Sequence, residues 1–188
     1  MAATRKQQEE FVAKLFPIAV KLYWESEGFH PFFVVAQAAM ETGWKIAGNN
    51  NNLFGITIGS SWKGPKSLSL TTEYFSTSNK RFTYPEEKVV SVEPVTRNGK
   101  VVYRYRVYRY FRVYASLEEC LEDYLKVLKG KNFTDAYPYK HDMNEYVERI
   151  VDDVGPKYAT DPDYARQMKK LMRQVNDIVD RLGLNKAL

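Results

Sequence analysis

The stretch VVAQAAMETGWKIAGNNNNLFGI, residues 34–56, holds a single carboxylate, Glu41, between an apolar run and a turn-rich segment. Pro31 suits the first turn of a helix and Gly43 suits its end, so a helix is predicted between them. This helix is apolar on nearly every side, which predicts a buried, central position. The asparagines at 49–52 predict the turn through which the chain leaves it.

Glu41 stands at an unfavourable place for a charged group. It falls in the last turn of the predicted helix, where unpaired carbonyl groups form a negative pole. That pole and partial burial both disfavour the ionised form, so the pKa of the carboxyl is expected to rise. A carboxyl that keeps its proton near neutral pH can act as the general acid in glycosidic cleavage. The residues alone leave a second interpretation open, an ordinary exposed glutamate at the end of a core helix.

A β-region is predicted after this turn. Residues 67–75, SLSLTTEYF, alternate in the manner of a strand. Segments 88–95 and 99–114 flank Asn98-Gly99, a strong hairpin signal, and we expect about four strands in all. Glu73, in the first of these segments, could face Glu41 across a groove, although three other acids compete with it from the residues alone: Glu86, Glu87 and Glu93.

The last predicted strand interleaves arginine with tyrosine, as YRYRVYRYFRVY at 103–114. Arg104 and Arg106 share one face and the parity changes by Arg109, which predicts a bulge or bend. Such a strand could hold phosphates while its rings stack on bases, so a module that binds single-stranded nucleic acid is a rival hypothesis from another class. A twisted, exposed strand with one solvated arginine face is the simpler interpretation.

Helices are predicted on both sides of the β-region. Residues 5–28 form an amphipathic pattern in which Pro17 predicts a kink or a split. Three further helices follow, which begin with a capping box at Ser116 and Glu119, with Asp142, and with Asp161-Pro162, the last reaching about Leu182. The order of elements predicts one α+β domain over residues 1–188, mostly helical, with a β lobe at about 53–114.

Composition restricts the function classes. The net charge of +5 and a pI near 9.1 favour anionic partners, among them nucleic acid, anionic membrane and bacterial wall polymers. No run approaches the roughly 20 apolar residues of a membrane span, so no membrane insertion is expected. The N-terminal residues lack the continuous apolar core of a secretory signal peptide.

The usual residues of cofactor and metal sites are sparse. Cys120, the single cysteine, follows a helical apolar pattern and is expected to be a buried or half-buried thiol. His30 and His141 lie more than a hundred residues apart and form no zinc motif with it. There is no Gly-rich phosphate loop, so no cofactor and no metal are expected.

Four motifs follow one another along the chain: AQAAMETGW (36–44) with NNNNLFGI (49–56), TTEYF (71–75), YFRVYASLEECLEDYLKVL (110–128) and YATDPDYARQM (158–168). Together they resemble the peptidoglycan glucosaminidases of glycoside hydrolase family 73, which include flagellar wall hydrolases, autolysins and phage lysins. The resemblance covers about residues 11–180. One segment departs from the family pattern: residues 76–110 are longer than its usual hairpin, which predicts an enlarged β lobe.

The resemblance implies a lysozyme-like fold and roles for three residues. Glu41 matches the general acid. Glu73 matches the second carboxylate, which serves as a base for water or stabilises developing positive charge. Tyr158 matches a tyrosine near the catalytic centre. The implied reaction cleaves the β-1,4 bond after N-acetylglucosamine in peptidoglycan by an inverting, a retaining or an acetamide-assisted route. An N-acetylmuramidase acting on the same polymer is the alternative, and a degenerate wall-binding domain is disfavoured because all three residues are present.

Aromatic residues are candidates for stacking on sugar rings in the groove. Trp44 and Phe54 could equally belong to the core, and for Phe54 the core is favoured. We expect a monomer that acts on cell-wall glycan strands and does not bind nucleic acid, released as a phage lysin or derived from a secreted autolysin. The candidate substrate-binding residues are Trp44, Asn52, Phe54, Trp62 and Tyr74.

Overall fold

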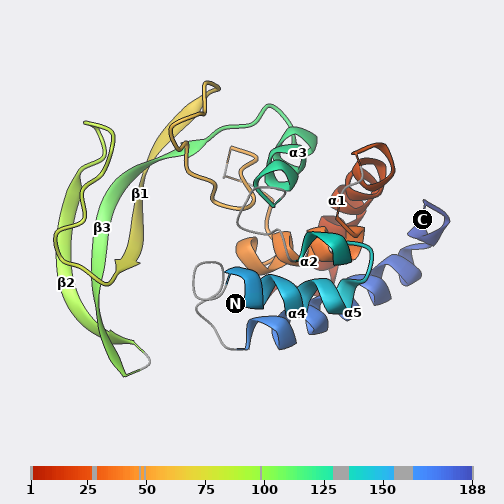
Figure 1. Cartoon of the computed structure of the whole chain (residues 1–188). Helices are drawn as coiled ribbons and strands as arrows, with labels where there is room; N and C mark the ends of the chain where they lie inside the picture. Colours follow the sequence, from red (N-terminus) through yellow and green to blue (C-terminus); the bar gives the residue numbers. More distant parts are fainter. Residues whose placement is uncertain are drawn as a thin grey trace. The chain divides into compact units, whose positions relative to one another are not determined.

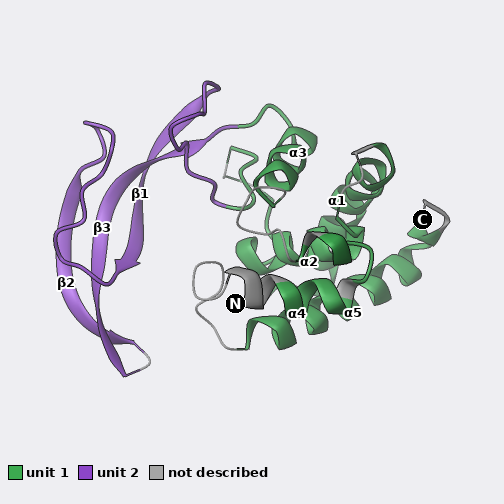
Figure 2. Ribbon diagram, viewed as in Figure 1, with its two compact units in different colours: residues 1–54, 114–188 green, residues 55–113 purple. Residues whose placement is uncertain are grey.

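A computed structural model describes residues 2–26, 29–46, 48, 50–97, 99–128, 136–154 and 163–187. The chain divides into two compact units, shown in green and purple in Figure 2. Residues 1–54 and 114–188 form the first, here called the helical unit. Residues 55–113 form the second, the sheet unit.

The helical unit is built from helices that follow the predicted order (Figure 1). Helix α1 continues through Pro17, so the predicted split does not occur. Pro17 has no N–H group to donate to the carbonyl of Ala13. Both residues are exposed, so water can donate to that carbonyl instead. The helices are α1 (Arg5–Ser26), α2 (Pro31–Thr42), α3 (Leu117–Leu128), α4 (Met143–Val154) and α5 (Tyr164–Leu182), with short 3₁₀ turns η2 (Tyr137–Tyr139) and η4 (Leu184–Ala187).

Helix α2 is the buried central helix that its composition predicts. All nine residues from Pro31 to Ala39 are buried, and the helix packs against α1 and α5. The His30 side chain accepts a hydrogen bond from the first turn, and Gly43 ends the helix at φ +60°, a conformation that glycine adopts without strain. The position of Glu41 in the last turn is therefore fixed by a well-defined helix end.

The predicted caps of the later helices are present where the structure describes them. Ser116 Oγ accepts from the backbone N–H of Glu119, and the Glu119 carboxylate accepts from Ala115 N–H, so the capping box of α3 is confirmed. Asp142 accepts from two backbone N–H groups at the start of α4. The predicted start of the last helix at residues 161–162 lies outside the described residues.

The sheet unit has three described strands, not the four predicted, in the order β1-β3-β2, all antiparallel. A single bridge between Thr57 and Phe111 takes the place of a fourth, because the chain around it is mostly turns. The hairpin predicted near Gly99 is confirmed, with Arg97 paired to Lys100. The strands are β1 (Lys66–Phe75), β2 (Val89–Arg97) and β3 (Lys100–Arg112).

The predicted bulge lies in a different strand from the one expected. β1 and β3 pair in register without interruption, whereas the pairing of β2 shifts between Val89 and Ser91. The parity change at Arg109 has a simpler cause. Arg109 lies two and four residues from Val107 and Tyr105, both buried, and so shares their face of the sheet.

The two faces of this sheet differ. One, here called the covered face, carries Tyr105, whose ring packs edge-on against Phe75 and Phe82. The Tyr105 hydroxyl donates to Thr77 O and accepts from Lys80 N–H, which ties the loop after β1 to this face. The other, the open face, carries exposed side chains from β1 and β3: Leu68, Leu70, Thr72, Tyr74, Arg104, Arg106 and Tyr108.

Candidate active site

Glu41 lies in the last turn of α2 and keeps part of its surface in solvent. The protein atoms around its carboxyl nevertheless remove enough water to raise its pKa above the ordinary value, as the sequence predicts. A hydrogen bond from Gln37 Nε2 to Glu41 Oε1, 3.0 Å long, acts in the opposite direction and lowers this pKa. Burial is the larger of the two effects, so the protonated form is favoured relative to a carboxyl in water.

The Gln37 amide is held by a second residue. Gln37 is 1% exposed, and the Tyr164 hydroxyl donates to its Oε1 at 2.6 Å. This bond turns the amide N–H₂ group toward Glu41. The helical spacing of four residues could have revealed the contact between Gln37 and Glu41. Tyr164, 127 residues from Gln37 in sequence, could not be placed without the fold.

Glu73 lies on β1 opposite Tyr105, on the covered face. Its side chain is 30% exposed, and its Oε1 lies 3.8 Å from Arg109 Nη1. Burial raises the pKa of the Glu73 carboxyl, and the positive charge of Arg109 lowers it. Glu73 is thus a partly desolvated acid beside a cation that favours its ionised form.

Arg109 also contacts a second carboxylate, Glu87. Its Nε lies 3.6 Å from Glu87 Oε1, and the Glu87 side chain is only 3% exposed. The same carboxylate accepts from the backbone N–H of Tyr110 at 3.1 Å, and the guanidinium lies 5.4 Å from the ring centre of Phe82. Buried Glu87 therefore anchors Arg109 beside Glu73. A cavity of about 280 Å³ adjoins this pair, lined by Thr57, Ile58, Gly59, Ser60, Thr83, Tyr84, Glu87 and Arg109.

The acids that compete with Glu73 have other surroundings. Glu87 is enclosed against Arg109, and Glu86 is exposed in the loop before β2. Glu93 forms an ion pair with Arg104 on the open face. Sequence reasoning missed the link from Arg109 to Glu73 because it depends on the pairing of β1 with β3.

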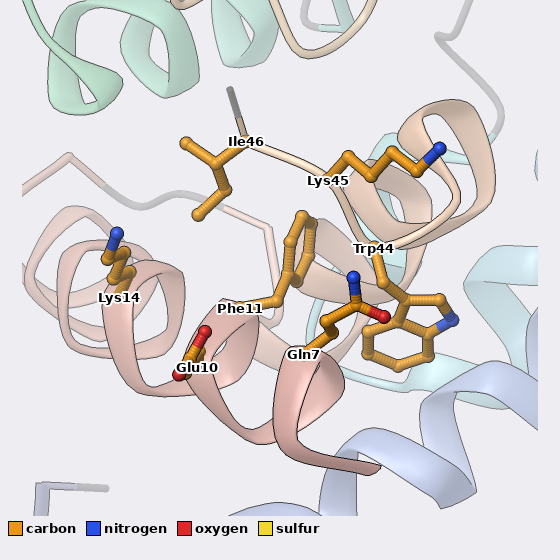
Figure 3. Close-up of a pocket in the computed structure, with 7 residues that line it drawn as sticks. All are labelled: Gln7, Glu10, Phe11, Lys14, Trp44, Lys45 and Ile46. Atoms are coloured by element: carbon orange, nitrogen blue, oxygen red, sulfur yellow. The ribbon is translucent and has the colours of Figure 1, made fainter. Parts of the chain in front are cut away.

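Trp44 lines a hollow of about 290 Å³ in the helical unit. Figure 3 shows its indole beside the side chains of Phe11 and Gln7, which come from α1. The Trp44 and Phe11 rings meet edge to face with centroids 5.6 Å apart. Trp44 has φ +66°, an unusual conformation for a bulky residue, and remains partly exposed three residues after Glu41.

Two predicted binding residues in the same unit are packed inward. Phe54 is half-buried, and its ring stacks on Tyr124 of α3 with centroids 3.7 Å apart. Asn52 is 7% exposed. The neighbouring Asn50 and Asn51 have positive φ, which asparagine tolerates, and Asn51 Nδ2 donates to Tyr114 O.

Tyr74 and Trp62, two other predicted site residues, have partners away from Glu73. Tyr74 follows Glu73 in the strand and so points to the opposite, open face, where Arg97 lies 4.2 Å from its ring centre. Trp62 donates from Nε1 to Pro65 O, and Arg112 lies 4.9 Å from its ring centre. Tyr158 lies outside the described residues.

Cys120 and His30 are two further reactive groups with described positions. Cys120 is buried as predicted, and burial raises the pKa of its thiol to about 12, so it is neutral and unsuited to nucleophilic attack. Burial, helped by the nearby His141, lowers the pKa of His30 to about 4. Among the residues with described positions, no three His, Cys, Asp or Glu side chains lie close enough to bind a metal, and no helix is long and apolar enough to cross a membrane.

Comparison with known proteins identifies relatives of this chain. The chain is 34% identical over 175 residues to the peptidoglycan hydrolase FlgJ of Pseudomonas aeruginosa, covering 89% of this chain and 36% of that protein. It is 27% identical over 182 residues to a probable N-acetylmuramidase of Lactococcus lactis, covering 93% and 35% respectively. The chain thus spans about a third of the length of these two relatives.

A solved structure confirms the expected lysozyme-like α+β fold. The glycoside hydrolase domain of Salmonella typhimurium FlgJ matches with a TM-score of 0.61 and 28% identity, covering 90% of this chain and 98% of that domain. Residues 18–177 match the glucosaminidase family model described as mannosyl-glycoprotein endo-beta-N-acetylglucosaminidase. The chain therefore belongs to this glucosaminidase family.

Proposed function

We propose that the chain hydrolyses the glycan strands of peptidoglycan in the bacterial cell wall, at the β-1,4 bond that follows N-acetylglucosamine. The observation that carries the proposal is Glu41, a partly desolvated carboxyl at the end of a buried helix, within the family motif. The names of the relatives support peptidoglycan as the polymer. The family description favours the bond after N-acetylglucosamine over that after N-acetylmuramic acid.

In this proposal Glu41 is the general acid. Its proton passes to the bridging oxygen while the bond from that oxygen to the sugar C1 breaks. The carboxylate left behind then accepts the Gln37 amide hydrogen bond, which favours the ionised form. Gln37, held by Tyr164, thus positions Glu41 and stabilises the charge that appears after proton transfer.

Glu73 is the proposed second carboxylate, and it works in its ionised form. In the base route it takes a proton from water as the water oxygen bonds to C1, and in the other routes its charge stabilises positive charge or orients the substrate acetamide. Arg109 opposes the effect of burial on the pKa of Glu73 and so favours the ionised form.

Both units contribute to the proposed catalytic domain, because Glu41 belongs to the helical unit and Glu73 to the sheet unit. We assign one sugar contact to Trp44, which is partly exposed at a hollow close to Glu41 in sequence. Tyr158 is assigned a supporting role near the catalytic centre only because it lies in the matching motif.

Two classes of new end group test the proposed reaction. Purified peptidoglycan is digested, and new reducing ends and new amino groups are measured in the same samples. A glycosidase releases reducing ends and no amino groups. New amino groups without reducing ends would mean that the chain cuts amide bonds, and the proposal would be wrong.

Replacing Arg109 with glutamine tests the role assigned to it. Arg109 lowers the pKa of Glu73, so its loss raises that pKa, and Glu73 takes up a proton at a higher pH. Since ionised Glu73 is required, the acidic limb of the pH–activity profile is expected to move to higher pH. The limb should move by roughly 0.7 pH unit, as for an ion pair worth about 1 kcal/mol.

The matched control is Arg149→Gln, which removes a partly exposed arginine paired to Glu145 on α4. Its pH profile should coincide with that of the wild type. An unshifted acidic limb in Arg109→Gln, in a variant that melts as the wild type does, would remove Arg109 from the mechanism.

A further inference from the structure

The open face of the sheet concentrates the basic charge of the chain. Strand alternation and the register of the sheet place six cations and one acid, Glu93, on it. This excess of five equals the net charge of the entire chain. The cations are Lys66, Arg97, Lys100, Arg104, Arg106 and Arg112.

Cations cover two tyrosine rings on this face. Arg97 lies 4.2 Å from the ring centre of Tyr74, and Lys66 lies 4.0 Å from that of Tyr110. These contacts hold the charged groups against the sheet. They also occupy ring surface on which nucleic-acid bases would have to stack.

A hollow of about 500 Å³ on the open face is lined by Thr72, Tyr74, Arg104 and Arg106. Arg104 is paired with Glu93. Arg106 is exposed and has no hydrogen bond or ion pair within the described part of the chain. Side chains two residues apart on one face of a strand are separated by roughly 7 Å. The guanidinium groups of Arg104 and Arg106 therefore lie in a row along β3, beside the hydroxyl of Thr72.

We propose that the open face binds a phosphodiester-linked polyol polymer of the bacterial cell envelope. Guanidinium groups in a row suit successive phosphates, and the Thr72 hydroxyl suits the polyol between them. A nucleic acid offers similar phosphates, but the cation-covered rings of Tyr74 and Tyr110 favour a polymer without bases. The proposal concerns a surface distinct from Glu73, on the other side of the sheet, and does not depend on which glycosidic bond is cleaved.

Equilibrium binding of labelled poly(glycerol phosphate) tests this surface directly. The wild type should bind it with an affinity that falls steeply as salt increases. The double variant Arg104→Gln/Arg106→Gln should lose affinity by about tenfold or more. The control is Arg149→Gln/Arg173→Gln, which removes one arginine paired to Glu145 on α4 and one exposed arginine on α5, and it should change affinity less than about twofold.

Three results would overturn the proposal. The first is no binding by the wild type, and the second is an equal loss in both double variants, which would reflect net charge alone. The third is tighter binding of oligo(dT) of equal charge that depends on the same arginines, which would identify a nucleic-acid surface. Thermal melting of each variant ensures that a loss of affinity is not a loss of fold, and hydrolysis of phosphate-free peptidoglycan, measured separately, reports on the enzymatic proposal.

Discussion

Glutamine at position 41 is expected to abolish the clearing of cell walls. The substitution keeps the size of the side chain and removes the proton that Glu41 would deliver to the glycosidic oxygen. General acid catalysis contributes on the order of a hundredfold to ten-thousandfold, so the loss of activity should be at least that large. The measurement is the rate of turbidity loss of a wall suspension, supported by counts of reducing ends.

The same variant should keep its fold. Burial raises the pKa of Glu41, so the folded chain binds this proton more tightly than the unfolded chain. The ionised carboxyl therefore opposes folding increasingly as the pH rises, and glutamine removes that effect. The melting temperature of Glu41→Gln should equal or exceed that of the wild type above neutral pH.

The control for this variant is Glu25→Gln, which neutralises an exposed acid near the end of α1. It should clear walls at the wild-type rate. Near wild-type activity of Glu41→Gln would contradict the assignment of the general acid.

Glutamine at position 73 is expected to cause a large but incomplete loss of activity, on the order of a hundredfold. The variant removes the negative charge that Arg109 maintains, whichever of the three routes operates. The acid Glu41 remains in place, so slow cleavage should continue. Turnover is measured with soluble glycan fragments, on which kcat and KM can be separated.

The matched control is Glu86→Gln, an exposed acid in the loop of the same unit. It should leave kcat and KM unchanged. Full activity in Glu73→Gln, or a comparable loss in Glu86→Gln, would transfer the second role to another acid.

Azide added to Glu73→Ala tests the acetamide-assisted route against the inverting and retaining routes. If Glu73 activates water or acts on C1 directly, azide, which needs no base, can attack C1 and restore turnover with a glycosyl azide as product. If Glu73 orients the substrate acetamide, azide should restore nothing.

Much of the helical unit could be predicted from local signals. The end of α2 follows from Gly43, and the raised pKa of Glu41 follows from burial at that helix end. The position of Tyr74 opposite Glu73 could also have been predicted, because neighbouring residues in a strand face opposite sides.

Pairings between distant segments could not be predicted. Arg109 meets Glu73 only because β1 and β3 pair in one particular register, and Tyr164 meets Gln37 only in the packed helical unit. The change of parity in the arginine pattern predicts a bulge or bend in β3, whereas Arg109 simply lies on the covered face and the bulge lies in β2. The sequence of one strand predicts which of its residues share a face of the sheet, but not which of two paired strands carries the extra residue of a bulge.

The identity of the sugar at the new reducing end shows which glycosidic bond is cleaved. Peptidoglycan is digested with the wild-type chain, the products are reduced with borohydride, and the fragments are identified by mass spectrometry. Reduced N-acetylglucosamine is expected at the new ends, because the proposed reaction cleaves the bond that follows this sugar. Reduced N-acetylmuramic acid at those ends would show instead that the chain is a muramidase.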